Sequence, residues 1–291
     1  MTAQLRALLG LVAVGLAGLA ATACSPLTAF NAFVPKDAVG EVSRNIAYGP
    51  LPRQRLDVYR PPGEPPNAPV IVFVHGGSWA SGSKNGYAWA GRALASRGYV
   101  AVVPDYRLVP EVRYPGFVED TALAIAWTHR NAARFGGNPD RLAVAGHSAG
   151  AYNAVQAVLA PEFLRAAGAE GSIVDALVSL SGPVDFLPLD TEASIDAFGQ
   201  VPAPALPATQ PINRLDGTAP PMLIVHGTED TVVAPRHATT LERLARERGV
   251  RADLHLLEGV DHRGVVLGLS RPFRGRVPTL DLIDAFLAEV L

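Results

Sequence analysis

The chain has 291 residues, enough for one large α/β domain or two small domains, with 48% hydrophobic residues, 18% charged residues and a formal net charge of -2. This balance is that of a globular protein and excludes a disordered or fibrous chain. The small net charge, with no run of lysines and arginines, speaks against binding to nucleic acid or to an acidic membrane surface.

The amino-terminal segment predicts export. Arg6 is followed by an uninterrupted run of apolar and small residues from Ala7 to Ala23. This run is somewhat short for a membrane span, which needs about 20 apolar residues. A basic start, an apolar stretch and an A-x-A pattern before residue 24 indicate a signal peptide over residues 1–23.

Cys24, the only cysteine, directly follows the predicted cleavage site. It is either the lipidated first residue of a bacterial lipoprotein, since the stretch resembles a lipobox, or an incidental residue after an ordinary cleavage site. The lipoprotein interpretation is favoured, although Ala21 stands where a lipobox more usually has leucine. Both predict an exported, periplasmic protein, anchored to a membrane in the first case. A single cysteine allows no internal disulfide.

The segment 24–40 is predicted to be a tether or a short helix, and residues 41–291 to be one domain. Strand-like runs follow at residues 55–61, 68–77, 99–107, 141–148, 173–182, 221–230 and 252–262. Helix-like runs lie at residues 86–98, 115–137, 151–160, 234–249 and 278–291. Alternating strands and helices predict an α/β fold with a mostly parallel sheet between two layers of helices.

Residues 146–150 read Gly-His-Ser-Ala-Gly, with Ser148 between a strand-like run and a helix-like run. The G-x-S-x-G motif alone arises by chance in a glycine-rich chain. A strand before the serine and a helix after it are what a nucleophile elbow requires, and small neighbours allow the sharp turn. We therefore interpret Ser148 as a nucleophile rather than as part of a structural turn.

A serine hydroxyl becomes nucleophilic when a base takes its proton, and the base is held by an acid. The expected order along the chain is Ser, then Asp or Glu, then His. Asp230 follows a strand-like run and His262 follows the last one. The sequence predicts Ser148, Asp230 and His262 as a catalytic triad, with Asp185 as the rival acid. Structural or surface roles are expected for Glu229, His237, His255 and Asp261.

The reaction also needs donors for a developing oxyanion. One is the backbone N–H of Ala149, directly after the serine. The others are expected in the loop H-G-G-S-W, where glycine lets the backbone approach closely. We assign the N–H groups of Gly77 and Ser78, with His75 and Gly76 supporting the loop.

These motifs together resemble the bacterial α/β-hydrolase carboxylesterases with an HGGxW oxyanion motif. Their relatives are the hormone-sensitive-lipase-like esterases, feruloyl-esterase-like proteins and kynurenine formamidases. The similarity runs through residues 48–61, 72–79, 104–155 and 220–233 and covers most of residues 41–265.

The resemblance implies an α/β-hydrolase catalytic domain over residues 41–291, the triad already named and ester hydrolysis as the activity. It also implies that the Asp105-Tyr106-Arg107 segment is a structural signature beneath the site, with Asp105 supporting the oxyanion loop. Ser78 is a departure, because the hormone-sensitive-lipase group usually has a third glycine there. This departure places the chain nearer to the HGGxW group, and the resemblance therefore does not specify the substrate.

The segment 181–217 lies where such folds insert a cap, and its alanine- and proline-rich composition predicts a small one. Four aromatic residues are candidates for an acyl pocket: Trp79, Tyr87, Trp89 and Phe198. No metal-binding cluster and no phosphate loop with a lysine occurs, so no cofactor or metal is expected. The partner is a small-molecule ester substrate.

Two alternatives to a carboxylesterase remain. One is an arylformamidase, amidase or peptidase using the same triad, because fold and triad do not determine which bond is cleaved. The other is a non-catalytic binding protein on a hydrolase scaffold, which is disfavoured because the chain keeps all three triad residues.

Overall fold

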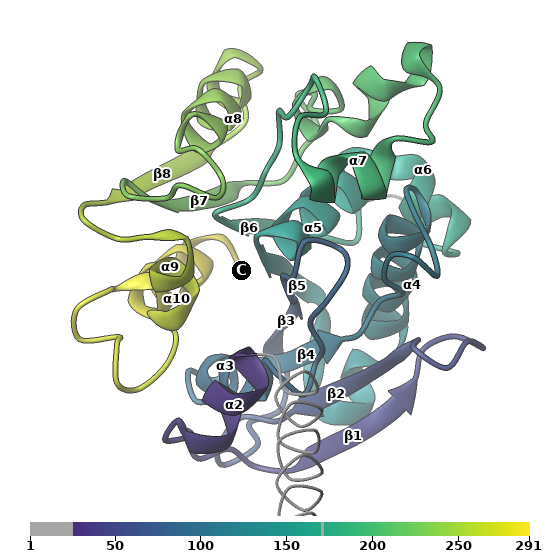
Figure 1. Cartoon of the computed structure of the whole chain (residues 1–291). Helices are drawn as coiled ribbons and strands as arrows, with labels where there is room; N and C mark the ends of the chain where they lie inside the picture. The colour runs from purple at the N-terminus through teal and green to yellow at the C-terminus, as the bar shows by residue number, and fades with distance from the viewer. Residues whose placement is uncertain (1–25, 170–171) are drawn as a thin grey trace, which may run out of the picture.

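The computed structural model describes residues 26–169 and 172–291 (Figure 1). The predicted signal peptide and Cys24 lie outside these residues. Within the segment 24–40, predicted to be a tether or a short helix, the chain forms helix α2 (Pro26–Phe33). No helix of the described ranges is both long enough and apolar enough to cross a membrane.

A single eight-stranded sheet runs through the described part of the chain. In spatial order its strands are β1 (Val42–Ala47), β2 (Arg55–Tyr59), β4 (Val100–Pro104), β3 (Ala68–Val74), β5 (Gly137–His147), β6 (Ala176–Leu180), β7 (Met222–Gly227) and β8 (Ala252–Leu257). Strand β2 is antiparallel to both of its neighbours, and all other pairs are parallel. The predicted mostly parallel sheet is therefore confirmed. Strand β1 was not predicted, because this edge strand is half-buried or exposed and lacks an apolar run.

Helices cover both faces of the sheet (Figure 1). One face carries α4 (Gly116–Asn131), α5 (Ala149–Leu159), α6 (Pro161–Ala166) and α8 (Arg236–Glu247). The other carries α3 (Ala88–Ala95), α9 (His262–Leu267) and α10 (Thr279–Val290), with α2 packed beside α3.

Strand β3 shows why the central strands read as continuous apolar runs. Successive side chains of a strand point to opposite faces of the sheet. Val70, Val72 and Val74 accordingly belong to the core beneath α4 and α5, and Ile71 and Phe73 to the core beneath α3 and α10. All five are fully buried. A parallel strand covered by helices on both sides has no polar face, so alternation disappears from its sequence.

The order of the strands places a crevice at the carboxyl edge of the sheet. Strand β3 is followed by β4 on one side of it, whereas β5 lies on its other side. Ligands of open α/β sheets bind outside the carboxyl ends of the strands at such a reversal. The loops after β3, β5, β7 and β8 carry the residues predicted for the site, and all four open toward this edge.

Candidate active site

Ser148 is the single residue between the end of β5 and the start of α5. Its backbone is at φ 56° and ψ -126°, a conformation that costs a non-glycine residue about 1–3 kcal/mol. The Ser148 N–H donates to the carbonyl of Leu180 at 2.9 Å, and the Ser148 carbonyl accepts from the Tyr152 N–H at 3.0 Å. The strained turn is thereby held by the neighbouring strand and by the following helix.

Glycines allow this turn to press against the end of β3. A Cβ atom on Gly150 would lie 2.2 Å from the carbonyl oxygen of Val74, and one on Gly76 would lie 2.9 Å from the carbonyl oxygen of His147, the residue before Ser148. Neither contact leaves room for a side chain. The two glycines therefore bring the loop after β3 and the serine turn into direct contact.

The loop after β3 turns sharply at three consecutive residues. Gly77, Ser78 and Trp79 have φ of 131°, 52° and 57°. The Gly77 carbonyl accepts from the N–H groups of Ala80 and Ser81 at 3.1 and 2.9 Å. Among the residues that the structure describes, the N–H groups of Gly77 and Ser78 find no acceptor, so both stay available to a ligand.

The Ala149 N–H likewise has no acceptor in the described part of the chain, because it opens helix α5. A side chain links this helix to the other two amides. The indole N–H of Trp79 donates to the Oδ1 of Asn153 at 3.0 Å. Asn153, which sequence reasoning missed, thus ties the Gly77–Ser78 loop to α5.

Asp105 and Tyr106, which follow strand β4, contact His75 in the loop after β3. The Tyr106 hydroxyl donates to the carbonyl of His75 at 3.0 Å, and their rings stack at 4.4 Å. Asp105 accepts from the Lys84 N–H at 2.6 Å and lies 3.5 Å from the Nε2 of His75. Burial would raise the pKa of Asp105, but the hydrogen bond and charge of His75 hold it below its ordinary value. These contacts link Asp105 and Tyr106 to His75 in the loop after β3.

Asp230 and His262 form a buried pair. The Nδ1 of His262 lies 2.8 Å from the Oδ2 of Asp230. The Oδ1 of Asp230 accepts from the N–H groups of Val232 and Val233 at 3.0 and 2.8 Å. The rival Asp185 instead lies 3.7 Å from the guanidinium of Arg236. The structure thus brings His262 to Asp230 and not to Asp185.

A second histidine, which sequence reasoning missed, contacts the same carboxylate. The Nε2 of His226 lies 3.2 Å from the Oδ2 of Asp230 and 2.8 Å from the carbonyl of Val233, to which it donates. Burial would raise the pKa of Asp230, but hydrogen bonds from His226, His262 and the Val233 N–H hold it well below its ordinary value. The lowered pKa favours the ionised form of Asp230.

His147, directly before Ser148, was also missed, although it is the first of the two variable residues of the G-x-S-x-G motif. Its Nε2 donates to the carbonyl of His262 at 3.0 Å, and its Nδ1 lies 3.3 Å from the Tyr87 hydroxyl, which then donates. The rings of His147 and His262 lie 4.9 Å apart. Burial, and repulsion by His262, lower the pKa of His147 to about 3. His147 is thus a neutral donor that holds the backbone of His262.

The lowered pKa of His147 predicts a loss of stability in acid. Below pH 6.5 the unfolded chain protonates this histidine, whereas the folded chain keeps it neutral down to about pH 3. The free energy of unfolding should therefore fall by up to about 1.4 kcal/mol per pH unit from this residue alone. Urea unfolding of the wild type and of His147→Gln, from about pH 7.5 to 4.5, measures the difference in slope. The contribution of the other buried histidine with a lowered pKa, His237, cancels between the two proteins. Identical slopes would contradict the assignment.

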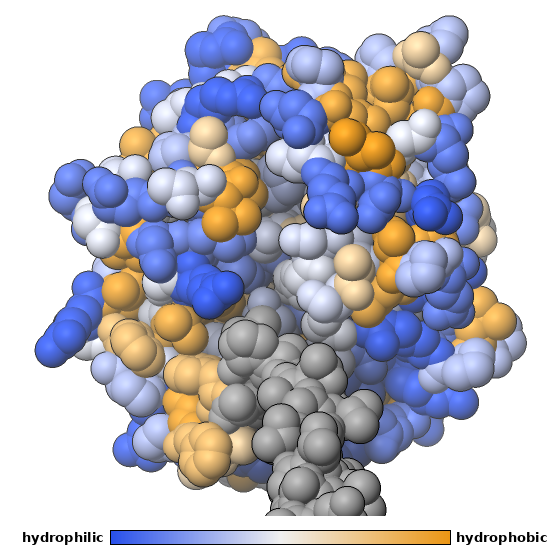
Figure 2. Space-filling view, viewed as in Figure 1, coloured by the Kyte–Doolittle hydropathy of each residue, from blue (hydrophilic) through white to orange (hydrophobic). Residues whose placement is uncertain are grey.

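Ser148 and His262 line one cavity of about 410 Å³, within the size range of small-molecule sites. The Gly77–Ser78 loop forms part of its wall. The remaining lining residues are Phe30, Ser81, Gly82, Tyr87, His147, Val232, Arg263, Val266 and Leu267. The face shown in Figure 2 carries hydrophilic and hydrophobic residues intermixed around its central hollow.

Helix α2 contributes a wall that the sequence did not reveal. Phe30 packs edge-on against Trp89 of α3, with ring centroids 5.3 Å apart. Tyr87 lines the cavity as predicted, but Trp79, Trp89 and Phe198 do not. These three are buried in the two cores instead, because large apolar rings gain most from complete burial.

The segment 181–217, for which a small cap was predicted, contains helix α7 (Glu192–Phe198) and the short 3-10 helices η2 (Ala203–Thr209) and η3 (Pro211–Asn213). It packs on α5: the Tyr152 hydroxyl donates to the carbonyl of Thr209 at 2.7 Å. None of its residues is among those that line the cavity beside Ser148.

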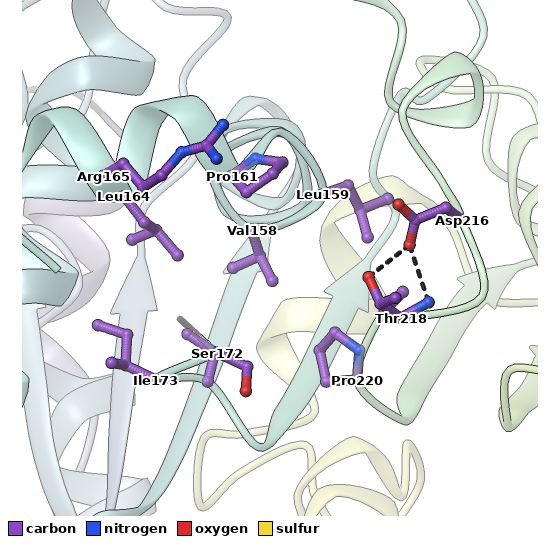
Figure 3. A pocket seen from close by; sticks show the side chains of 12 residues that line it. Val158, Leu159, Pro161, Leu164, Arg165, Ser172, Ile173, Asp216, Thr218 and Pro220 are labelled. Carbon is purple, nitrogen blue, oxygen red and sulfur yellow. Dashed lines mark hydrogen bonds between the residues drawn. The ribbon is translucent and has the colours of Figure 1, made fainter. Parts of the chain in front are cut away.

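A second cavity of about 410 Å³ lies between α5, α6 and the segments that precede β6 and β7 (Figure 3). It therefore lies at the opposite end of these parallel strands from Ser148. Its carboxylate, Asp216, accepts from the N–H and hydroxyl of Thr218 at 2.8 and 2.6 Å. No residue predicted for the site lines this cavity.

The chain is similar to proteins of known family, several of which are esterases. The BD-FAE family matches residues 56–244. Esterase LipC of Mycobacterium tuberculosis is 35% identical over 271 residues, a match that covers 85% of this chain and 65% of LipC. A probable isoprenylcysteine alpha-carbonyl methylesterase of Oryza sativa subsp. japonica is 30% identical, with 81% of this chain and 60% of the relative covered. The chain thus spans less than two thirds of the length of these curated relatives.

A solved structure, a hyperthermophilic esterase from the archaeon Pyrobaculum calidifontis, superposes with a TM-score of 0.74 at 27% identity. The match covers 91% of this chain and 90% of that one. A parallel sheet with a serine at a strand-to-helix elbow defines the protein as an α/β-hydrolase. Within that class the chain belongs to the BD-FAE family, which confirms the resemblance to α/β-hydrolase carboxylesterases.

Proposed function

We propose that the protein is a serine esterase that hydrolyses carboxylic esters through an acyl-enzyme. One observation carries the proposal: His262, whose Nδ1 is hydrogen-bonded to the buried Asp230, lines the same cavity as Ser148, a serine held at a strained elbow. An imidazole oriented by a buried carboxylate beside such a serine is the arrangement that activates a hydroxyl for attack on a carbonyl.

In the first half of the reaction, the Oγ of Ser148 attacks the ester carbonyl and its proton passes to the Nε2 of His262. The carbonyl oxygen gains a negative charge and accepts hydrogen bonds from the N–H groups of Gly77, Ser78 and Ala149. These amides have no acceptor in the described chain, so they require no rearrangement before they bind the oxyanion. His262 then protonates the leaving alcohol, and the acyl group stays on Ser148.

In the second half, water attacks the acyl-enzyme while His262 takes its proton. The carboxylic acid leaves and Ser148 regains its hydrogen. Asp230, ionised throughout, stabilises the imidazolium that forms in both halves and keeps the Nδ1–H of His262 directed at itself. His147 supports the same ring by holding the His262 carbonyl.

Covalent labelling tests the nucleophile. A fluorophosphonate probe is expected to add to the wild type at a single serine, which peptide mass spectrometry should identify as Ser148. Ser148→Ala should not be labelled, and its circular dichroism spectrum should match that of the wild type. Labelling that persists in Ser148→Ala would refute the proposal.

A substrate panel tests which bond is cleaved. The wild type is assayed on 4-nitrophenyl acetate, on the matching anilide and on a formanilide. We expect the ester to have the highest kcat/KM, because its alcohol leaves more readily than an amine. A higher kcat/KM for the formanilide would instead identify an arylformamidase.

A further inference from the structure

The cavity beside Ser148 is asymmetric in charge. Its side walls are apolar or aromatic and come from Phe30, Tyr87, Val232, Val266 and Leu267. Arg263 is the only lysine or arginine among the lining residues, and no aspartate or glutamate is among them. A ligand in this cavity therefore meets one permanent positive charge and no compensating carboxylate.

Arg263 keeps this charge available to a ligand. It is solvent-exposed, and it makes no hydrogen bond or ion pair with the residues that the structure describes. The neighbouring Asp261 makes no ion pair with it, and its Oδ1 instead accepts from the Gly264 N–H at 2.7 Å. Arg274, in contrast, is paired with Asp37 at 2.7 Å.

The charge of Arg263 also influences Tyr87, another residue that lines the cavity. Burial raises the pKa of the Tyr87 hydroxyl, and the positive charge of Arg263 opposes that increase. Tyr87 lines the cavity and contacts His147, next to Ser148. Arg263 and Tyr87 therefore line the same cavity, beside His147 and Ser148.

We propose that Arg263 is an anion subsite, so that the preferred substrates are esters with a carboxylate or similar anionic group on their acyl or alcohol part. This inference rests on the proposed esterase function. The apolar walls bind the hydrocarbon portion of the ester, and the guanidinium receives the anionic end at the solvent-exposed mouth. A guanidinium suits this task because its planar fork pairs with a carboxylate through two N–H groups.

The test compares matched esters in pairs. The acyl pair is 4-nitrophenyl hexanoate and the mono-4-nitrophenyl ester of adipate, which has a carboxylate at the end of the same six-carbon chain. The alcohol pair is phenyl butyrate and the butyrate ester of 4-hydroxybenzoate. For each pair, the kcat/KM of the anionic ester is divided by the kcat/KM of the neutral ester. In at least one pair this anionic-to-neutral ratio should be higher in the wild type than in Arg263→Gln. An exposed ion pair predicts a change of about two- to fivefold in this ratio.

Charge reversal and salt sharpen the test. Arg263→Glu should lower the anionic-to-neutral ratio further than Arg263→Gln, because repulsion replaces attraction. In about 1 M NaCl the ratio of the wild type should approach that of Arg263→Gln, since the screening length falls to about 3 Å. The matched control is Arg271→Gln, which removes an exposed arginine of the same segment that does not line the cavity. This control should keep the ratio of the wild type.

Two outcomes separate this inference from the proposed function. If the wild type hydrolyses the neutral esters and both ratios are unaffected by Arg263→Glu, the anion subsite is wrong and the esterase function stands. If no ester is hydrolysed, the proposed esterase function is wrong, and the anion subsite is tested by ligand binding alone. The dissociation constants of the adipate and hexanoate esters are then measured in Ser148→Ala, with and without Arg263→Glu. Equal ratios of the two constants would overturn the subsite.

Discussion

Hydrolysis of 4-nitrophenyl acetate is expected to fall by about 10⁴- to 10⁶-fold in Ser148→Ala and in His262→Ala. The alanine variants lack the attacking hydroxyl and the base that takes its proton, so each interrupts the same step. The double variant Ser148→Ala/His262→Ala should be no slower than the slower single variant, because a base without a nucleophile has nothing to activate. The measurement is kcat for the three variants and the wild type.

A residual rate above that of the uncatalysed reaction is expected in all three variants. The N–H groups of Gly77, Ser78 and Ala149 are unaffected by these substitutions and still bind an oxyanion formed by attack of water. His255→Ala is the matched control, because this partly buried histidine lies on β8 and does not line the cavity. A His262→Ala variant as active as His255→Ala would contradict the assignment of the base.

The Asp230→Asn variant is expected to lose about 10⁴-fold in kcat with its fold retained. The amide oxygen of asparagine can still accept from the N–H groups of Val232 and Val233, so the loop keeps its anchors. The amide nitrogen, however, would donate toward His262 where the carboxylate now accepts. The Nδ1 of His262 must then accept this hydrogen bond with its lone pair. The Nε2 carries the proton instead and no longer acts as a base.

The Asp185→Asn variant is the matched control for this prediction. Asp185 was the rival acid in the sequence, but in the structure it faces Arg236 at the surface. Its replacement should leave kcat within about twofold of the wild type, as for most surface substitutions. Steady-state kinetics of both variants, with thermal unfolding to verify folding, decide between the carboxylates. A large loss in Asp185→Asn together with an active Asp230→Asn would reverse the assignment.

Local patterns in the sequence were sufficient to predict seven of the eight strands, all except β1, and the loops that follow them. The apolar runs of β3 and β5 reflect burial on both faces, and the small residues around Ser148 reflect a turn that admits no larger side chain. Because the carboxyl ends of parallel strands share one edge, the order of Ser148, Asp230 and His262 along the chain already predicted that they would meet. These inferences need only neighbours in sequence and the geometry of a parallel sheet.

Partners that come from distant segments were not predictable in this way. His226 and His147 contact the Asp230–His262 pair, yet each lies in or at the end of a strand-like run, where a histidine has no distinctive pattern. Phe30 reaches the cavity because α2 packs beside α3, across more than fifty residues of sequence. Such contacts depend on how the helices pack on the finished sheet.

The sequence by itself determined the α/β architecture, the elbow at Ser148 and the order of the candidate triad, because periodicity, glycine placement and strand direction are local properties of a chain. Only the tertiary structure decided that Asp230 rather than Asp185 holds His262, that α2 and not the segment 181–217 lines the cavity, and that Arg263 stands alone there as a charge. These contacts depend on packing between segments far apart in sequence, which local patterns do not specify.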